Sequence, residues 1–188
     1  MKVPIEISAR HVHLSQKDFE RLFGKNKKPT FSRKLSQEEE FASEEKVVLI
    51  NANNKIENVR VIGPFRKYSQ LEISLTDAYN LRLKPLPKIK ISGDVSNTTK
   101  ILVRGPNSSI KIPCIIAKRH LHCSVQESKR LKLKNSQEVS MKIKGTRGTT
   151  FHNVVVRVDE DYKLSLHLDT DEGNSAGITG KIFGEMIK

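Results

Sequence analysis

The sequence predicts a mainly β protein built from two similar halves. Three observations carry this prediction: short apolar runs separated by turn-forming residues, a short motif that occurs twice, and helix signals that are few. The chain has 188 residues, enough for one large domain or two small ones. Hydrophobic residues make up 36% of it, so a core is possible without being large.

Apolar and β-branched runs recur along the chain. Gly, Asn, Pro and Asp bound them, as is usual for the strands of β-sandwiches and barrels. The predicted strands are 47–50, 59–62, 71–75, 101–103, 110–116, 139–143, 154–158 and 164–168.

Helix signals are local. Residues 15–23 begin with Ser15, a favourable N-cap, and stop at Gly24, which suits a helix end. Residues 124–133 form the equivalent segment of the second half, and residues 76–81 are a third candidate. The sequence therefore predicts a few short helices, two of them directly after a histidine-containing segment.

An Arg-His-x-His element occurs at residues 10–13 and again at 119–122. The longer alignment sets ISARHVHLS against IAKRHLHCS, which indicates an internal repeat. Side chains two apart in an extended chain point to the same side, so His11 with His13, and His120 with His122, can each aim two imidazoles at one point. Neutral imidazole is a common metal ligand. The repeat predicts two metal sites or one shared site, and the alternative is two pairs of ordinary surface or hydrogen-bonded histidines.

The repeat supplies a third ligand-type side chain to each half. Aligning LEISLTD (71–77) with LHLDTD (166–171) makes Glu72 and His167 equivalent. Three protein ligands and one open position are the pattern of catalytic zinc. Strand alternation alone leaves open that Glu72 is simply exposed; the repeat favours the ligand role.

Arg66 follows a Gly-Pro turn shortly before Glu72. A guanidinium offers a bidentate fork to phosphate or carboxylate, so an arginine here suits an anionic substrate.

The amino-acid composition indicates which classes of binding partner are expected. The net charge of +13 favours polyanions such as nucleic acid, an anionic membrane surface or phosphorylated ligands, although scattered lysines also fit an ordinary solvated surface. No apolar run is long enough for a transmembrane helix. The N-terminus enters the first repeat without an apolar signal region, so a cytoplasmic location is expected.

Cys114 and Cys123 form no C-x-x-C pair. Cys123 could bind a metal, but the favoured alternative is that it is a buried, unreactive thiol.

These motifs together identify a family resemblance. The chain resembles the PduL-type phosphotransacylases (phosphate propanoyltransferases) nearly end to end. The segments that carry the resemblance are SARHVHLS, LSQEEEFASEE, GPFRKYSQLEISLTDA, ISGD, AKRHLHCS, and HLDTDEGNSA with the preceding NVVVRV.

The resemblance implies two β-barrel domains capped by short helices, with the first strand exchanged between the halves. It implies residues 1–9 plus 118–188 as one domain, residues 10–117 as the other, and the active site between them. The implied reaction is acyl-CoA plus phosphate going reversibly to acyl phosphate plus coenzyme A.

The resemblance also implies site residues. Two Zn²⁺ ions per chain are expected. One would be held by His11, His13 and Glu72, and the other by His120, His122 and His167. Arg66 matches an arginine that holds phosphate, and the other polar positions expected near the substrates are Ser8, Arg33, Arg60 and Asn174.

Several positions depart from the family pattern. Glu38 and Glu39 stand where Pro-Gly is common, Arg33 replaces an expected lysine, and LKPLP (83–87) replaces a Gly-rich stretch. No N-terminal microcompartment-targeting extension precedes the first repeat. A free cytoplasmic enzyme is therefore expected, a homodimer that uses acetyl- or propanoyl-CoA and is coupled to an acetate or propionate kinase.

Two other functions compete with the acyltransferase. A His-x-His metal-dependent hydrolase or thioesterase would use the same ligands, but such enzymes commonly need a longer barrel. A basic β-barrel that binds nucleic acid would explain the charge, yet base stacking needs exposed aromatic residues and the chain has no Trp, three Tyr and seven Phe.

Overall fold

The computed structural model describes residues 1–187, and these residues form a mainly β protein with four short helices. The chain divides into two compact units, Met1–Ala9 with Lys118–Lys188, and Arg10–Ala117. Each unit contains a closed six-stranded β-barrel, here called the terminal barrel and the internal barrel. The predicted fold class is confirmed.

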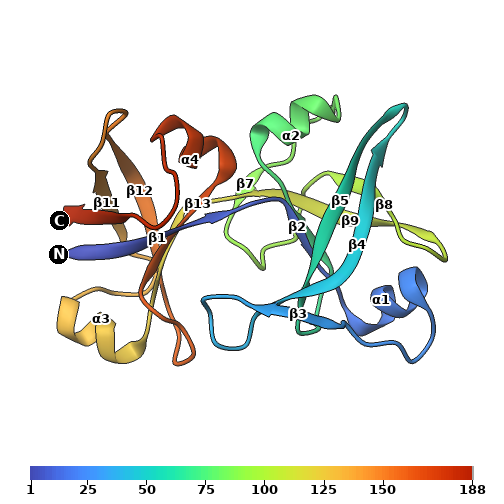
Figure 1. Ribbon diagram of the computed structural model, residues 1–188, viewed down its shortest axis with the longest axis horizontal. Helices are drawn as coiled ribbons and strands as arrows, with labels where there is room; N and C mark the ends of the chain where they lie inside the picture. Colours follow the sequence, from blue (N-terminus) through green and yellow to red (C-terminus); the bar gives the residue numbers. More distant parts are fainter. Residues whose placement is uncertain (188) are drawn as a thin grey trace. The chain divides into compact units, whose positions relative to one another are not determined.

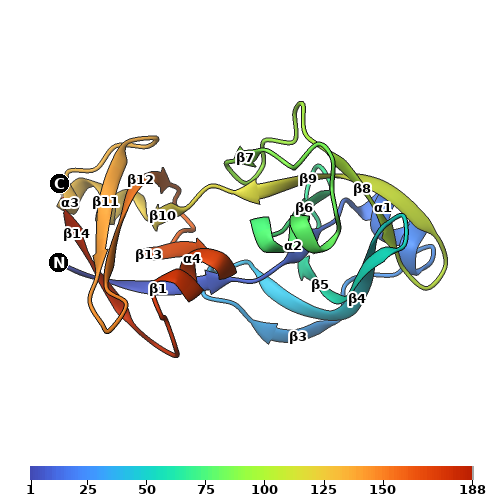
Figure 2. The ribbon, with the colours of Figure 1, turned by 90° about the horizontal axis from the view of Figure 1, so that it is seen from above.

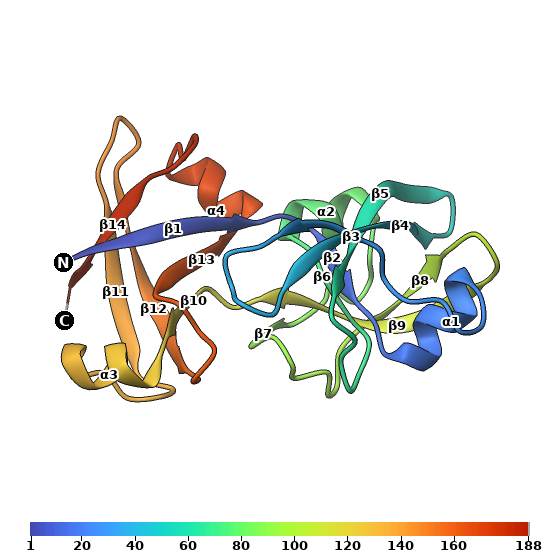
Figure 3. The ribbon, with the colours of Figure 1, turned by 60° about the horizontal axis from the view of Figure 1, so that its bottom comes forward.

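The terminal barrel closes because β14 pairs with both β11 and β1 (Figure 1). Going round the barrel, its strands are β1 (Lys2–Ser8), β13 (Ser165–Asp169), β10 (His120–Cys123), β12 (Thr149–Val158), β11 (Glu138–Ile143) and β14 (Phe183–Ile187). Figure 3 shows β1 and β14 side by side, so the first strand of the chain is held by the last.

The internal barrel closes through β8, which pairs with β4 and β9. Its strands in order are β4 (Phe41–Asn51), β5 (Asn54–Gly63), β2 (His11–His13), β6 (Gln70–Glu72), β9 (Ser109–Ala117) and β8 (Lys100–Arg104). Two short strands, β3 (Phe31–Lys34) and β7 (Ile89–Lys90), extend it by pairing with β4 and β9.

The first strand of each repeat belongs to the barrel of the other repeat. β1 precedes the first His-x-His pair, yet it runs parallel to β13 in the terminal barrel. β9 precedes the second pair, yet it runs parallel to β6 in the internal barrel. The exchanged strands occupy equivalent places, which is the strand exchange that the family resemblance implied.

Short capped helices follow the strands that carry the motifs. They are α1 (Gln16–Phe23), α2 (Leu75–Asn80), α3 (Val125–Leu131) and α4 (Thr170–Ser175). Ser15 and Ser124 cap α1 and α3 as predicted, because each side chain accepts a hydrogen bond from a backbone N–H of the first turn. Figure 2 shows α1 beside β8 and β9 at one end of the internal barrel; the backbone N–H of Asn107 donates to the carbonyl of Leu22 there.

Two predicted elements end earlier than expected, and one helix was missed. The strand predicted at 71–75 ends at Glu72, because Ser74 caps α2 through a capping box with Asp77. The helix predicted at 124–133 ends at Leu131, where Lys132 adopts a left-handed conformation with φ of 54°. Helix α4 was not predicted, because Gly173 and Asn174 are poor helix formers in a six-residue segment.

Each barrel encloses its own apolar core. Val12 and Leu121, the middle residues of the two His-x-His pairs, are fully buried in these cores. Because neighbouring residues of a strand face opposite sides, the histidines on either side of them point out of the barrels. None of the described helices is long and apolar enough to cross a membrane.

Candidate metal centres

The internal barrel brings His11, His13 and Glu72 together. Strand β2 lies antiparallel to β6, with His11 opposite Glu72 and Val12 opposite Leu71. Val12 and Leu71 fill the core, so the three polar side chains share the outer face of the two strands. Glu72 is only 6% exposed, so the alternative that it is a solvent-facing strand residue was wrong.

The ligand-type atoms of this triad are close enough to share one ion. Nε2 of His11 lies 3.1 Å from Nε2 of His13 and 3.7 Å from Oε2 of Glu72, and one ligand atom from each residue lies within 4.8 Å of the others. Ligands about 2.1 Å from a tetrahedral zinc are roughly 3.4 Å apart. Burial, together with His11 and Arg66, holds the pKa of His13 well below its ordinary value, so its imidazole is neutral, as a ligand must be.

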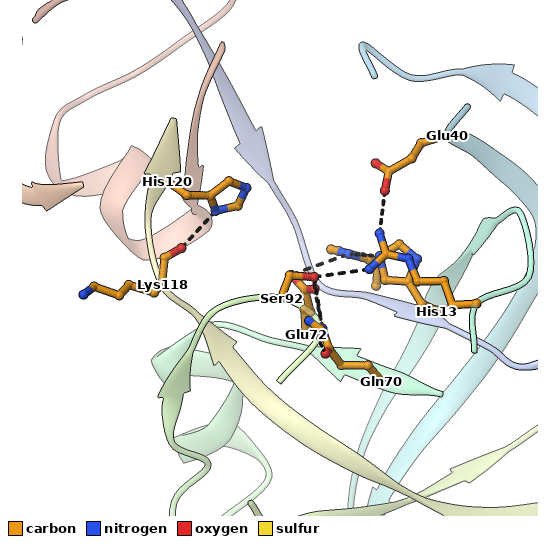
Figure 4. Close-up of polar contacts among 10 residues, drawn as sticks. His13, Glu40, Gln70, Glu72, Ser92, Lys118 and His120 are labelled. Carbon is orange, nitrogen blue, oxygen red and sulfur yellow. Dashed lines mark hydrogen bonds and ion pairs between the residues drawn. The ribbon is translucent and has the colours of Figure 1, made fainter. Parts of the chain in front are cut away.

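A network of polar side chains fixes the Glu72 carboxylate. Gln70 and Ser92 donate to Oε1 of Glu72 at 2.6 and 2.5 Å (Figure 4). The backbone N–H of Gly93 donates to the Gln70 side chain. The bonds from Gln70 and Ser92 both go to Oε1, while Oε2 lies on the side of His11. Supporting hydrogen bonds of this kind orient metal ligands in proteins.

Arg66 is joined to the same network. Its guanidinium donates to the Ser92 hydroxyl at 3.3 Å and forms an ion pair with Glu40 at 2.6 Å. About a third of the Arg66 side chain is exposed, so an anion from solvent can reach it.

The terminal barrel brings together His120, His122 and His167 in the equivalent arrangement. Strand β10 lies antiparallel to β13, with His120 opposite His167, and Leu121 and Leu166 between them fill the core. The ring centroids of the three histidines lie 4.4 to 5.1 Å apart, and one ring nitrogen from each lies within 4.8 Å of the others. The sequence left open one shared site; the structure forms two triads, each within its own barrel.

Neighbours orient this second triad as well. Nδ1 of His120 lies 2.9 Å from the carbonyl oxygen of Lys118, a contact of the kind that orients a metal-binding imidazole (Figure 4). His167 contacts the Ser165 hydroxyl at 2.9 Å and the Glu6 carboxylate at 3.5 Å. Tyr162 stacks on His122 with 4.0 Å between the ring centroids.

The donor sets fit divalent zinc. Two imidazoles with one carboxylate, and three imidazoles, are both known ligand sets of catalytic zinc, and each leaves a coordination position for substrate or water. Cys123 does not join the second triad. It is fully buried in the core of the terminal barrel, and burial raises the pKa of its thiol to about 11.

The remaining predicted site residues lie on strands and helices near the triads or at the surface. Arg60 lies on β5 opposite His11, and its guanidinium donates to the carbonyl of Ser43 at 2.6 Å. Ser8 ends β1 opposite Asp169, the N-cap of α4. Arg33 is exposed on β3, and Asn174 is exposed on α4.

Sequence reasoning missed the side chains that support the triads: Glu6, Glu40, Gln70, Ser92 and Ser165. A signal existed for two of them. Gln70 and Ser165 both stand two residues before the third ligand-type residue, and such a position shares its side of a strand. Ser92 had no comparable signal, because a loop brings it to Glu72 from 20 residues away in the sequence.

The fold and the two triads define a two-barrel protein with two candidate metal centres, one of two histidines and a glutamate and one of three histidines. Comparison with known proteins places it more narrowly. A profile of the phosphate propanoyltransferase family matches residues 4–179. The chain belongs to this family, and it is therefore an enzyme of the phosphotransacylase class.

Individual members of this family align with the chain over most of their own length. A phosphate propanoyltransferase of Lachnoclostridium phytofermentans is 43% identical over 180 residues, which cover 94% of this chain and 83% of the relative. One of Thermotoga maritima is 40% identical over 175 residues, which cover 92% of this chain and 82% of the relative. One of Alkaliphilus metalliredigens is 38% identical over 190 residues, covering 100% and 89%. These matches do not favour the nucleic-acid-binding or hydrolase alternatives.

Proposed function

We propose that this chain catalyses the reversible transfer of an acyl group between coenzyme A and phosphate, with acetyl-CoA or propanoyl-CoA as donor. The supporting observation is that a chain of the phosphate propanoyltransferase family carries both ligand triads, each gathered on one outer face of a barrel. A second function is not favoured by any feature of either triad.

His11, His13 and Glu72 would hold one Zn²⁺, and His120, His122 and His167 the other. Bound zinc would supply Lewis-acid stabilisation of the charge that develops as the thioester is cleaved. The two sets differ in charge, because the glutamate brings one negative charge and three neutral imidazoles bring none. We therefore expect the three-histidine centre to be the stronger Lewis acid.

Arg66 is proposed to bind the phosphate. Its fork can donate two hydrogen bonds to phosphate oxygens, and Ser92 already fixes one side of the guanidinium. Because Glu40 occupies the other side, phosphate must displace that carboxylate or share the guanidinium with it. Ser92 also donates to Glu72, so the phosphate arginine and a proposed metal ligand are held by one hydroxyl.

The transfer needs no oxidant or reductant. A phosphate oxygen attacks the thioester carbonyl carbon, the carbon–sulfur bond breaks, and the proton lost by phosphate balances the one taken up by the coenzyme A thiol. The residues that hold phosphate contribute by orienting its oxygen toward the carbonyl, since fixed orientation lowers the barrier of such a step.

The proposed partners follow from this chemistry. Acyl-CoA and phosphate are anions, and the net charge of +13 favours their capture. We further propose that the enzyme is a cytoplasmic homodimer, and that an acetate or propionate kinase uses its acyl phosphate.

The test is phosphate-dependent release of coenzyme A from acetyl-CoA and propanoyl-CoA, measured before and after a chelator removes metal. We expect activity that needs phosphate, disappears with the chelator and returns with zinc. The rates with the two substrates give the acyl preference. Release that does not depend on phosphate would instead support a thioesterase.

Histidine variants provide a matched control within the chain. His11→Ala and His167→Ala should each lose nearly all activity. His152 is the one histidine outside both triads; it is exposed and contacts Ser140, so His152→Ala should keep normal kinetics. Normal acyl-phosphate formation by either triad variant would contradict the proposal.

A further inference from the structure

Metal binding does not account for the arginine of the repeated Arg-His-x-His motif. Arg10 and Arg119 each stand directly before the first histidine of a pair, and neither is a metal ligand type. Each forms an ion pair inside its own barrel unit, Arg10 with Asp77 and Arg119 with Glu172.

Asp77 has two tasks at the start of α2. Its backbone N–H donates to the Ser74 hydroxyl at 3.2 Å, and its Oδ2 accepts from the backbone N–H of Ser74 at 3.3 Å, which completes a capping box. Its Oδ1 accepts from Nη1 of Arg10. Asp77 is only 2% exposed, so its charge needs this partner.

Glu172 divides its carboxylate in the same way at the start of α4. Its backbone N–H donates to Asp169 at 2.8 Å, and its Oε2 accepts from the backbone N–H of Asp169 at 3.1 Å. Its Oε1 lies 3.0 Å from Nε of Arg119. The linkage is thus the same in both barrels although the acid and the arginine nitrogen differ.

The two ends of each linkage lie beside the ligand triad. In each unit the third ligand-type residue, Glu72 or His167, stands two residues before the helix cap. The arginine stands one residue before the first histidine. The backbone pairing between these strands ends at His11 opposite Glu72 in one unit, and at His120 opposite His167 in the other. The ion pair therefore ties the two ligand-bearing segments together where their backbone pairing stops.

We propose that Arg10 and Arg119 are positioning residues, each of which holds the third ligand of its own triad at the correct separation from the histidine pair. This inference rests on the proposed metal binding. An ordinary surface ion pair contributes about 0–1 kcal/mol to stability and has no influence on a metal site. A pair that fixes ligand geometry instead changes metal affinity, and outer partners of metal ligands typically contribute about 10- to 100-fold.

The test is competitive zinc titration of the full chain against a chromophoric chelator at pH 8. The wild type should bind two equivalents. Arg10→Met should weaken one of them about tenfold, Arg119→Met should weaken the other to a similar degree, and the double variant should weaken both. Arg10→Lys and Arg119→Lys keep the charge and should restore part of the affinity. Arg104→Met and Arg130→Met remove exposed arginines, one from each unit, and should leave both equivalents unchanged.

Assignment to a particular triad comes from combination with Glu72→Ala. Once Glu72 is absent, Arg10→Met should cost no further zinc affinity, whereas Arg119→Met should still weaken the remaining equivalent. The melting temperature of the metal-free protein is measured alongside. Arg10→Met lowers it under either role, because the buried Asp77 carboxylate loses its cationic partner. A positioning role weakens one equivalent only, while a general structural role weakens both equivalents together.

Several outcomes would overturn the proposal. Unchanged zinc affinity in both Met variants is one, and equal weakening of both equivalents by a single variant is another. If a Met variant does not fold, the zinc affinity of the corresponding Lys variant is measured in its place. A Lys variant that binds both equivalents with wild-type affinity counts against the proposal. A wild type that binds no zinc would overturn the metal-binding proposal itself. Two tightly bound equivalents that no arginine variant weakens would overturn only the positioning role.

Discussion

Replacing Glu40 with glutamine should make the enzyme more efficient toward phosphate. Glu40 lies 2.6 Å from the Arg66 guanidinium, and both side chains are about 30% exposed. If Arg66 binds phosphate, the carboxylate competes with the substrate for the same donors. A glutamine is nearly the same size but carries no charge, so phosphate should displace it from the Arg66 guanidinium more readily.

The size of the effect follows from the exposure of the pair. Partly exposed ion pairs contribute about 1 kcal/mol or less, and about 1.4 kcal/mol corresponds to a tenfold change in an equilibrium constant. We therefore expect Glu40→Gln to raise kcat/KM for phosphate roughly two- to fivefold, at saturating acyl-CoA. The value of kcat should change little, because the carboxylate competes with binding rather than with the chemical step.

The assay is coupled release of coenzyme A at increasing phosphate concentration. Glu57→Gln is the matched control, because it also removes one negative charge and an ion pair of 2.6 Å, with Lys55, on β5. The control should leave kcat/KM for phosphate unchanged. A lower kcat/KM for phosphate in Glu40→Gln would contradict this prediction, since it would mean that Glu40 orients Arg66 for phosphate instead of competing with it.

Two further predictions concern buried groups. Cys114 and Cys123 are fully buried and burial raises the pKa of both thiols, so neither should react with a thiol reagent at pH 8 until the protein is unfolded; rapid labelling of the native protein would contradict this. Burial first, and then the charge of Asp169, raise the pKa of Glu172 to about 7 from its ordinary 4.5, despite the opposing effects of the hydrogen bond from the Asp169 backbone and of the Arg119 charge. The folded state then binds more protons than the unfolded state between these pH values, so the free energy of unfolding should fall as pH rises from about 4.5 to 7, by on the order of 3 kcal/mol. Denaturant unfolding of the wild type and Glu172→Gln tests this, and an equal pH dependence in both proteins would exclude Glu172 as its source.

Much of the fold could be predicted because strand signals are local. The runs around 47–50, 59–62 and 110–116 lie within β4, β5 and β9, since β-branched residues bounded by turn formers favour a strand wherever they occur. Predictions were wrong where a cap decided the boundary. Ser74 begins a helix inside a segment that the apolar pattern extended as strand, and Asp169 begins one that the sequence analysis did not predict.

The sequence determined the identity of the two triads, because the internal repeat set His11, His13 and Glu72 against His120, His122 and His167. Alternation along a strand also determined that the two histidines of each pair share one side, opposite to Val12 or Leu121. The family could be recognised because its long sequence motifs are contiguous and follow one another in the same order along this chain. These features depend on neighbours in the chain, so a single sequence can reveal them.

The surroundings of the triads depend on long-range folding. Ser92 and Glu40 meet Glu72 and Arg66 because strands and loops distant in the sequence converge, and no spacing in the sequence encodes that convergence. The ion pairs of Arg10 and Arg119 could not be predicted from spacing either. Their acidic partners lie more than 50 residues away, each in the capping box of a short helix. Local patterns fix which side chains a strand can present, whereas long-range packing fixes which charges and hydrogen bonds hold them in place.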